Sequence, residues 1–124
     1  MKAGKYRGSK EYMVVYSELI NAARSRGTLT YQDIAPTMGL PLTGSHMGAE
    51  IGALIGEISE DEVNLGRPML SALVINVKGS PGPGFYGWAE DLGKLKGGES
   101  KADQRKFWKA EKEAVYETWS KWAK

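Results

Sequence analysis

The chain has 124 residues and a formal net charge of +2 at pH 7, and its apolar and charged residues occur in the proportions of an ordinary globular protein. The length predicts one domain with a single core, and no apolar run approaches the roughly 20 residues of a membrane-spanning helix. The absence of cysteine excludes disulfides, thiolate nucleophiles and cysteine metal sites. Because the first residues lack the pattern of a signal peptide, a cytoplasmic location is expected.

Charge is segregated along the chain. Residues 1–26 contain six Lys and Arg against two acids, and residues 94–124 contain nine against five, so each end carries +4. Residues 27–93 contain two basic residues against eight acids and carry −6. If nucleic acid binds, most of the charge that neutralises phosphates lies at the two ends.

Two helices are predicted in the first third of the chain. The first runs over residues 9–26, because its apolar residues follow the spacing of one helix face and Gly27 stands where a left-handed C-cap would. Those apolar residues are Tyr12, Val15, Tyr16, Leu19, Ile20 and Ala23. After a short extended link, Thr30 followed by Asp33 predicts the N-cap of a second, short helix. Pro36 must kink or end that helix, since proline has no backbone N–H to donate.

A third helix is predicted over residues 45–64, after a turn at residues 39–41, and it carries a glycine at every fourth position. The glycines are Gly44, Gly48, Gly52 and Gly56. Apolar residues between them keep a helical period, which excludes a flexible linker, and no Lys follows in the segment, which excludes a phosphate-binding loop. Four residues advance a helix by about 400°, so the glycines form a slanted groove bare of side chains. The groove favours close packing inside the domain, with self-association or approach to a nucleic-acid backbone as alternatives.

The rest of the chain predicts one strand and two helices. Residues 69–77 are rich in branched apolar residues, which predicts a largely buried strand. A tight loop over 78–84 and a short helix over 85–92 follow. After a flexible connection over 94–99, a long charged helix is expected over 100–123. Its apolar stripe consists of Phe107, Trp108, Ala114, Val115, Trp119 and Trp122.

Together these elements predict an α+β fold that is mainly α, in a single domain over residues 1–124. It comprises a basic N-terminal arm over 1–10, a winged-helix-like core over 11–93 with one main strand, and the long C-terminal helix over 100–123. The order of helix, link, capped short helix, turn, helix, strand and glycine-rich loop is typical of a helix-turn-helix of the winged type.

Residues 27–35 with the turn at 39–41 resemble the DNA-binding part of the O6-alkylguanine DNA alkyltransferases and of the alkyltransferase-like proteins. The residues that match letter by letter are Thr30-Tyr31, Ile34-Ala35, Gly39 and Pro41. By order of elements the resemblance covers about residues 27–90. It implies a helix-turn-helix that enters the minor groove, with Tyr31 at the position of the tyrosine that helps to rotate the target nucleotide.

Two residues of that family have no counterpart here. Residues 44–64 contain no Lys or Arg to match the arginine that fills the gap left by the rotated nucleotide. The family's reactive cysteine motif should fall near residues 67–70, and a chain without cysteine cannot transfer an alkyl group. Residues 67–75 and 80–85 are also similar to small uncharacterised bacterial modules, some of them associated with mobile elements.

The leading hypothesis is a non-enzymatic nucleic-acid-binding protein that uses no cofactor and no metal. Its predicted contacts are Lys2, Lys5, Arg7, Tyr31, Arg67, Lys78, Arg105, Lys106 and Lys109. Lys112 belongs to the same basic ridge of the last helix, where a solvated face is the alternative. The acidic helix over 45–64 opposes this hypothesis, because Glu50 and Glu57 would be repelled by phosphates in a groove.

The alternative hypothesis is a protein-interaction or homodimerisation module. Its predicted interface residues are Gly48, Gly52, Gly56, Trp108, Trp119 and Trp122. For the tryptophans, packing onto the core is the favoured interpretation. His46 is interpreted as an exposed or cap-region residue rather than a ligand contact or general base. The carboxylates Glu57, Glu60, Asp61 and Glu62 are interpreted as a solvated face rather than a metal site.

Overall fold

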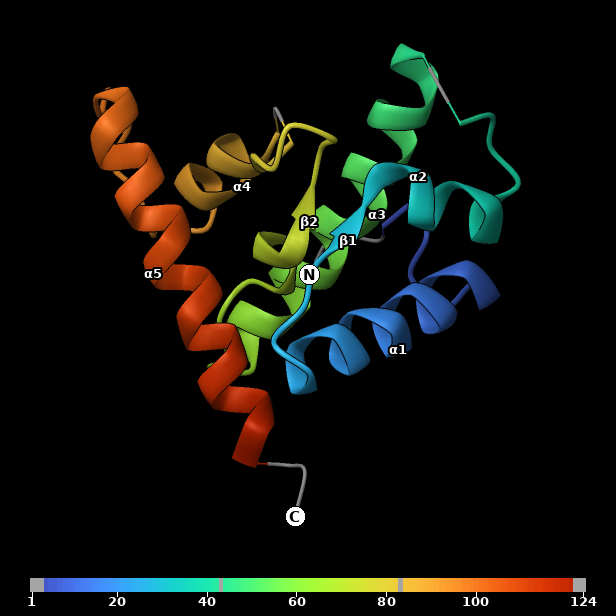
Figure 1. Ribbon diagram of the computed structural model, residues 1–124, viewed down its shortest axis with the longest axis horizontal. Helices are drawn as coiled ribbons and strands as arrows, with labels where there is room; N and C mark the ends of the chain where they lie inside the picture. Colours follow the sequence, from blue (N-terminus) through green and yellow to red (C-terminus); the bar gives the residue numbers. More distant parts are fainter. Residues whose placement is uncertain (1–3, 43, 83, 122–124) are drawn as a thin grey trace.

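The computed structural model describes residues 4–42, 44–82 and 84–121. It confirms a mainly helical α+β fold with a long C-terminal helix, which lies along one side of the molecule (Figure 1). The elements in chain order are α1 (Lys10–Arg24), β1 (Leu29–Thr30), α2 (Tyr31–Ile34), the 3₁₀ helix η1 (Ala35–Met38), α3 (Ser45–Asn64), the 3₁₀ helix η2 (Leu70–Leu73), β2 (Val74–Ile75), α4 (Phe85–Asp91) and α5 (Lys101–Ser120). None of the described helices is long and apolar enough to cross a membrane.

The ends of α1 show how local sequence sets the helix bounds. The Ser9 side chain caps the first turn by accepting a backbone hydrogen bond. The predicted C-cap at Gly27 is wrong, because the helix ends earlier, with Ser25 as C-cap. Arg26 then takes the left-handed conformation with φ of 57°, which lets the N–H of Gly27 reach back to the carbonyl oxygen of Ala22 at 2.8 Å.

The predicted capping box of α2 is confirmed. Thr30 Oγ1 accepts a hydrogen bond from Asp33 N at 3.1 Å, and Asp33 Oδ2 accepts one from Thr30 N at 2.9 Å. Pro36 ends the α-helical turn, as predicted, and the chain continues through η1 to Gly39 in the left-handed conformation. The 20 residues of α3 confirm a helix through the glycine-rich stretch and exclude the linker and the phosphate loop.

The predicted strand over residues 69–77 is wrong over most of its length. Residues Leu70–Leu73 form η2, and only Val74–Ile75 are extended, pairing in parallel with Leu29–Thr30 of β1. The partner strand is this short because Tyr31 already begins α2. The predicted burial is correct for residues 69–74 and wrong at Val77, which is 77% exposed. The side chains of η2 are buried, so the apolar run fills the centre of the domain instead of extending a sheet.

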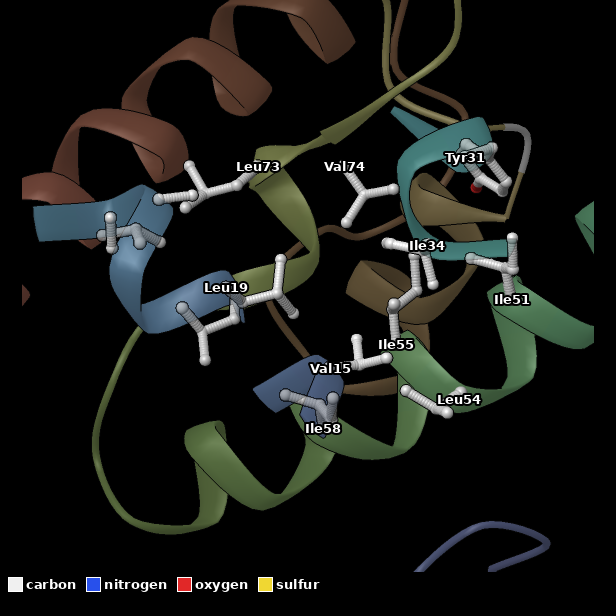
Figure 2. Packing of buried hydrophobic residues seen from close by; sticks show 14 of the residues in the cluster. Val15, Leu19, Tyr31, Ile34, Ile51, Leu54, Ile55, Ile58, Leu73 and Val74 are labelled. Carbon is white, nitrogen blue, oxygen red and sulfur yellow. The ribbon is translucent and has the colours of Figure 1, made fainter. Parts of the chain in front are cut away.

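The core is built on both sides of η2. Figure 2 shows the main cluster, in which side chains from α1, α2 and α3 meet Leu73 and Val74. A second cluster joins α4 to α5 through Phe85, Ala89 and Trp108. The two clusters together fix α5 against the rest of the domain along much of its length, which makes α5 a rigid support for the side chains on its outer surface.

Candidate nucleic-acid interface

Four cations of α5 share one flank of the helix. Steps of four, four and three residues separate Lys101, Arg105, Lys109 and Lys112. At about 100° per residue these steps place all four within an arc of about 80°. Lys101, Arg105 and Lys109 are exposed and Lys112 is half-buried. We call these four residues the α5 stripe; Lys106 lies on the exposed surface beside it.

The buried indole of Trp108 supports two members of the stripe. Its Nε1 donates a hydrogen bond to the carbonyl oxygen of Ala72 at 2.9 Å, which fixes the ring against η2. The Lys112 ammonium lies 4.4 Å from the ring centroid and the Arg105 guanidinium 5.6 Å from it. These cation–π contacts hold the two side chains along the helix, and neither side chain forms an ion pair with an acid of the described residues.

The acids nearest to the stripe in the sequence, Glu111 and Glu113, have other partners. Glu111 is turned into the protein, where it accepts hydrogen bonds from Lys94 Nζ at 2.7 Å and from Met69 N at 2.9 Å. Glu113 pairs with Arg26. Within residues 4–42, 44–82 and 84–121, no ion pair includes a member of the stripe. The positive charge of this flank is therefore available to an external anion.

The predicted contacts at the N-terminal end lie in a different environment. Residues 4–8, here called the strap, run along α3, so the basic arm is packed on the acidic helix. Lys5 Nζ lies 2.7 Å from Glu50 Oε1, and Arg7 Nε lies 2.9 Å from Asp61 Oδ1. Arg7 Nη2 also lies 2.5 Å from Glu60 Oε1. Lys2 lies outside the described residues.

Arg67 is held in an ion pair at the end of α3. Its Nε and Nη2 donate to the two carboxylate oxygens of Glu62 at 2.9 and 2.8 Å, and the Tyr16 hydroxyl donates to Oε2 at 2.9 Å. The guanidinium also lies 5.3 Å from the Trp119 ring centroid. The hydrogen bonds with Glu62 raise the pKa of Arg67, while burial, reinforced by Glu62, raises the pKa of Tyr16. Arg67 thus compensates a carboxylate that is only 1% exposed.

Tyr31 and Lys78 differ in their access to solvent. The Tyr31 ring is part of the core, and its hydroxyl occupies the space that a Cβ at Gly82 would take. Burial raises the pKa of Tyr31, and stacking on a base would require this ring to leave the core. Lys78 is exposed in the loop that the Ile75–Pro81 bridge closes.

The predicted interface residues divide into covered and open positions. The Trp88 ring lies against Gly56 so closely that a Cβ there would overlap it, whereas a Cβ at Gly48 or Gly52 would meet no atom of the described residues within 4 Å. Trp108 and Trp119 are buried against the core, 3% and 7% exposed. Trp122 lies outside the described residues. The tryptophan stripe is thus a packing surface over its described part, and the open part of the glycine groove is at Gly48 and Gly52.

The remaining candidates are one histidine and the carboxylates of α3. His46 is exposed in the first turn of α3. The carboxylates Glu57, Glu60, Asp61 and Glu62 are not a solvated face: the strap and Arg67 occupy them. Throughout the part of the chain that the structure describes, no group of three or more His, Asp or Glu is arranged to hold a metal ion.

Sequence reasoning missed the partners of these carboxylates. Glu50, Glu57 and Asp61 are separated by steps of seven and four residues, so the sequence does place them on one helix face. That signal predicts a shared acidic surface, but the strap that covers it lies about fifty positions away in the chain. Comparisons with family models, with curated proteins and with solved structures find no match to this chain.

Proposed function

We propose that the protein binds the phosphate backbone of nucleic acid through the α5 stripe, without catalysing a reaction. The observation that carries the proposal is the placement of four cations on one flank of a rigid helix, with no ion pair to the described residues around them. Phosphates that meet such a flank release their counterions, which supplies a sequence-independent, salt-dependent affinity. We propose that this binding takes place in the cytoplasm.

The arrangement of α3 supports backbone binding rather than base readout. A winged-helix protein inserts its recognition helix into a groove, but residues 45–64 contain no Lys or Arg. The carboxylates of this helix already attract the cations of the strap. Insertion would bring these acids close to phosphates, so the contact surface on this chain is α5, with Lys106 beside the stripe and Lys78 on a separate loop.

Two triple variants with the same change in net charge test the proposal. One replaces Lys101, Arg105 and Lys109 of the stripe by Gln. The control replaces Lys10, Arg24 and Lys121, which are also exposed, by Gln. We expect wild-type affinity for duplex DNA, single-stranded DNA or RNA to fall with salt with a log–log slope of about −3 to −4, one unit per phosphate contact. The stripe variant should lose most of this slope and the control should keep it.

The result that overturns the proposal is an absence of salt-dependent binding by the wild-type protein at low ionic strength. Equal losses in the two variants would also overturn it, because they would show that net charge, and not the stripe, determines affinity. Circular dichroism of both variants establishes that the helices are intact before binding is measured.

A protein-interaction or homodimer role is the second candidate. The observation that favours it is the free space at Gly48 and Gly52, where a Cβ would meet no described atom within 4 Å and another backbone could approach α3 closely. Sedimentation of the wild-type protein and of Gly52→Leu tests it: an interface on this surface should be lost in the variant. A wild-type protein that stays monomeric at all concentrations and binds no protein partner through this face contradicts it.

A further inference from the structure

The strap is held to α3 by its backbone as well as by its side chains. Three consecutive amides converge on the Glu57 carboxylate: Lys5 N lies 2.8 Å from Oε2, and Tyr6 N and Arg7 N each lie 3.0 Å from Oε1. Successive backbone N–H groups that point at one anion form a cradle for negative charge. Because Glu57 is only 6% exposed, these three hydrogen bonds replace most of its hydration.

Gly4 is the position at which the strap depends on the absence of a side chain. A Cβ at Gly4 would overlap the Oε1 atom of Glu57, the oxygen that two of the amides contact. The carboxylate cannot move aside without losing those hydrogen bonds. A larger residue at Gly4 is therefore expected to lift the strap from α3 while the charge of the protein stays the same.

The side chains of the strap complete the contact. Lys5 and the Tyr6 hydroxyl both bind Glu50, and Arg7 binds Asp61 and Glu60. The Arg7 side chain is only 17% exposed and the Lys5 side chain 61% exposed. The strap thus brings two cations onto carboxylates of α3, where Arg7 is mostly covered and Lys5 shares its charge with Glu50.

We infer that the strap is an autoinhibitory contact that withholds Lys5 and Arg7 from nucleic acid. This inference rests on the proposed function. A polyanion offers these cations the same kind of partner as the carboxylates of α3, so binding can exchange one set of ion pairs for another. When the strap is released, the segment ahead of α1 adds two phosphate contacts to those of the α5 stripe.

The full-length variant Gly4→Leu tests the inference, with Gly87→Leu as the matched control. Gly87 is exposed in α4, and a Cβ there meets no atom within 4 Å among the residues that the structure describes. Trypsin cleaves after Lys and Arg, so its rate of cleavage after Lys5 and Arg7 reports how often the strap opens. We expect Gly4→Leu to be cleaved in the strap at least about tenfold faster than wild type, as local opening predicts, and Gly87→Leu to be cleaved at the wild-type rate.

The salt dependence of nucleic-acid binding is the second measurement. Two additional contacts should make the log–log slope of Gly4→Leu steeper by about two units, or about a further tenfold loss of affinity between roughly 50 and 200 mM salt. Adding Lys5→Ala and Arg7→Ala should remove this gain in the Gly4→Leu protein. The same two substitutions should leave the slope nearly unchanged when Gly4 is retained.

The outcomes separate the inference from the proposed function. An unchanged slope in a Gly4→Leu protein whose strap trypsin shows to be open overturns the inference and leaves the α5 stripe in place. Unchanged cleavage overturns the role of Gly4 and with it the inference. If Gly4→Leu binds nucleic acid and the wild-type protein does not, the autoinhibitory role of the strap is supported and the binding role of the α5 stripe is overturned. If neither the wild-type protein nor any variant binds nucleic acid, both proposals are overturned. If Gly4→Leu does not fold, Glu57→Gln replaces it, with Glu90→Gln as its charge-matched control, because Glu90 is exposed and forms no ion pair with the described residues.

Discussion

The two basic ends of the chain carry the same formal charge, +4 over residues 1–26 and +4 over residues 94–124, yet their cations have different surroundings. In the strap, Lys5 and Arg7 lie on carboxylates of α3. On α5 the stripe has no acidic partner among the described residues. A run of charge is therefore expected to bind an external anion only where tertiary contacts leave it uncompensated.

The glycines of α3 repeat this contrast on a smaller scale. Gly56 and Gly52 occupy equivalent positions one step apart in the sequence pattern. Trp88 covers the first, and open space lies over the second. For the cations and for the glycines alike, residues of the same kind differ in their contacts because a distant segment of the chain covers one and not the other.

The largest loss of stability is expected on substitution of Arg67, whose guanidinium is ion-paired with Glu62. Arg67→Ala leaves Glu62, which is 1% exposed, without its bidentate partner, and breaking a buried pair in this way costs about 3–5 kcal/mol of unfolding free energy. Urea denaturation measures the change. If Arg67 instead acted like the cations of the α5 stripe, the variant would keep its stability and lose nucleic-acid affinity.

The next effect in size separates the two glycines. Gly56→Ala forces a Cβ into the Trp88 ring, and overpacking of this kind destabilises by about 1–3 kcal/mol. The Cβ of Gly52→Ala meets no atom of the described residues within 4 Å and improves helix propensity, so a gain of about 0.4–1 kcal/mol is expected. In thermal unfolding, the melting temperature of Gly56→Ala should fall and that of Gly52→Ala should rise. Shifts of the same sign would show that the covering of Gly56 does not matter to stability.

A smaller effect is expected at Tyr6 in the strap. Burial, and then the hydrogen bond with Glu50, raise its pKa to about 12. A raised pKa means that the phenol stabilises the fold fully below its ordinary pKa of 10.0, and that this contribution is lost as the pH rises through about 12. At neutral pH, Tyr6→Phe should cost about 1 kcal/mol for the lost hydrogen bond.

The tyrosinate absorbance of the two proteins measures this directly. The difference between wild type and Tyr6→Phe on alkaline titration should show a step displaced above the ordinary value. A tyrosinate absorbance step for Tyr6 at its ordinary pKa would contradict the strap contact.

On the acid side, the hydrogen bond from Lys5 lowers the pKa of Glu50. The stabilisation that ionised Glu50 gives to the fold is therefore present above the ordinary pKa of a glutamate and is lost as the pH falls through the lowered pKa.

The sequence predicts the helices better than it predicts their partners, for a physical reason. The capping box at Thr30 and the apolar periodicity of α3 act within a few residues, so they can be read locally. The run over residues 69–77 was predicted to be largely buried, which is correct for residues 69–74, but whether it pairs as a strand depends on the length of β1, which Tyr31 ends. The cradle around Glu57 likewise depends on a segment about fifty residues away.

The smallest effect on stability is expected at Lys109, an exposed member of the stripe. Lys109→Ala removes no ion pair known in the described chain, so its unfolding free energy should stay within about 0.5 kcal/mol of wild type. Its nucleic-acid affinity should nevertheless fall, with the log–log salt slope reduced by about one unit. Arg67→Ala is the opposite case, because it removes the same charge and should lower stability while the folded protein keeps its slope. An unchanged log–log salt slope in Lys109→Ala would show that Lys109 contacts no phosphate, and the proposed function of the α5 stripe would be contradicted.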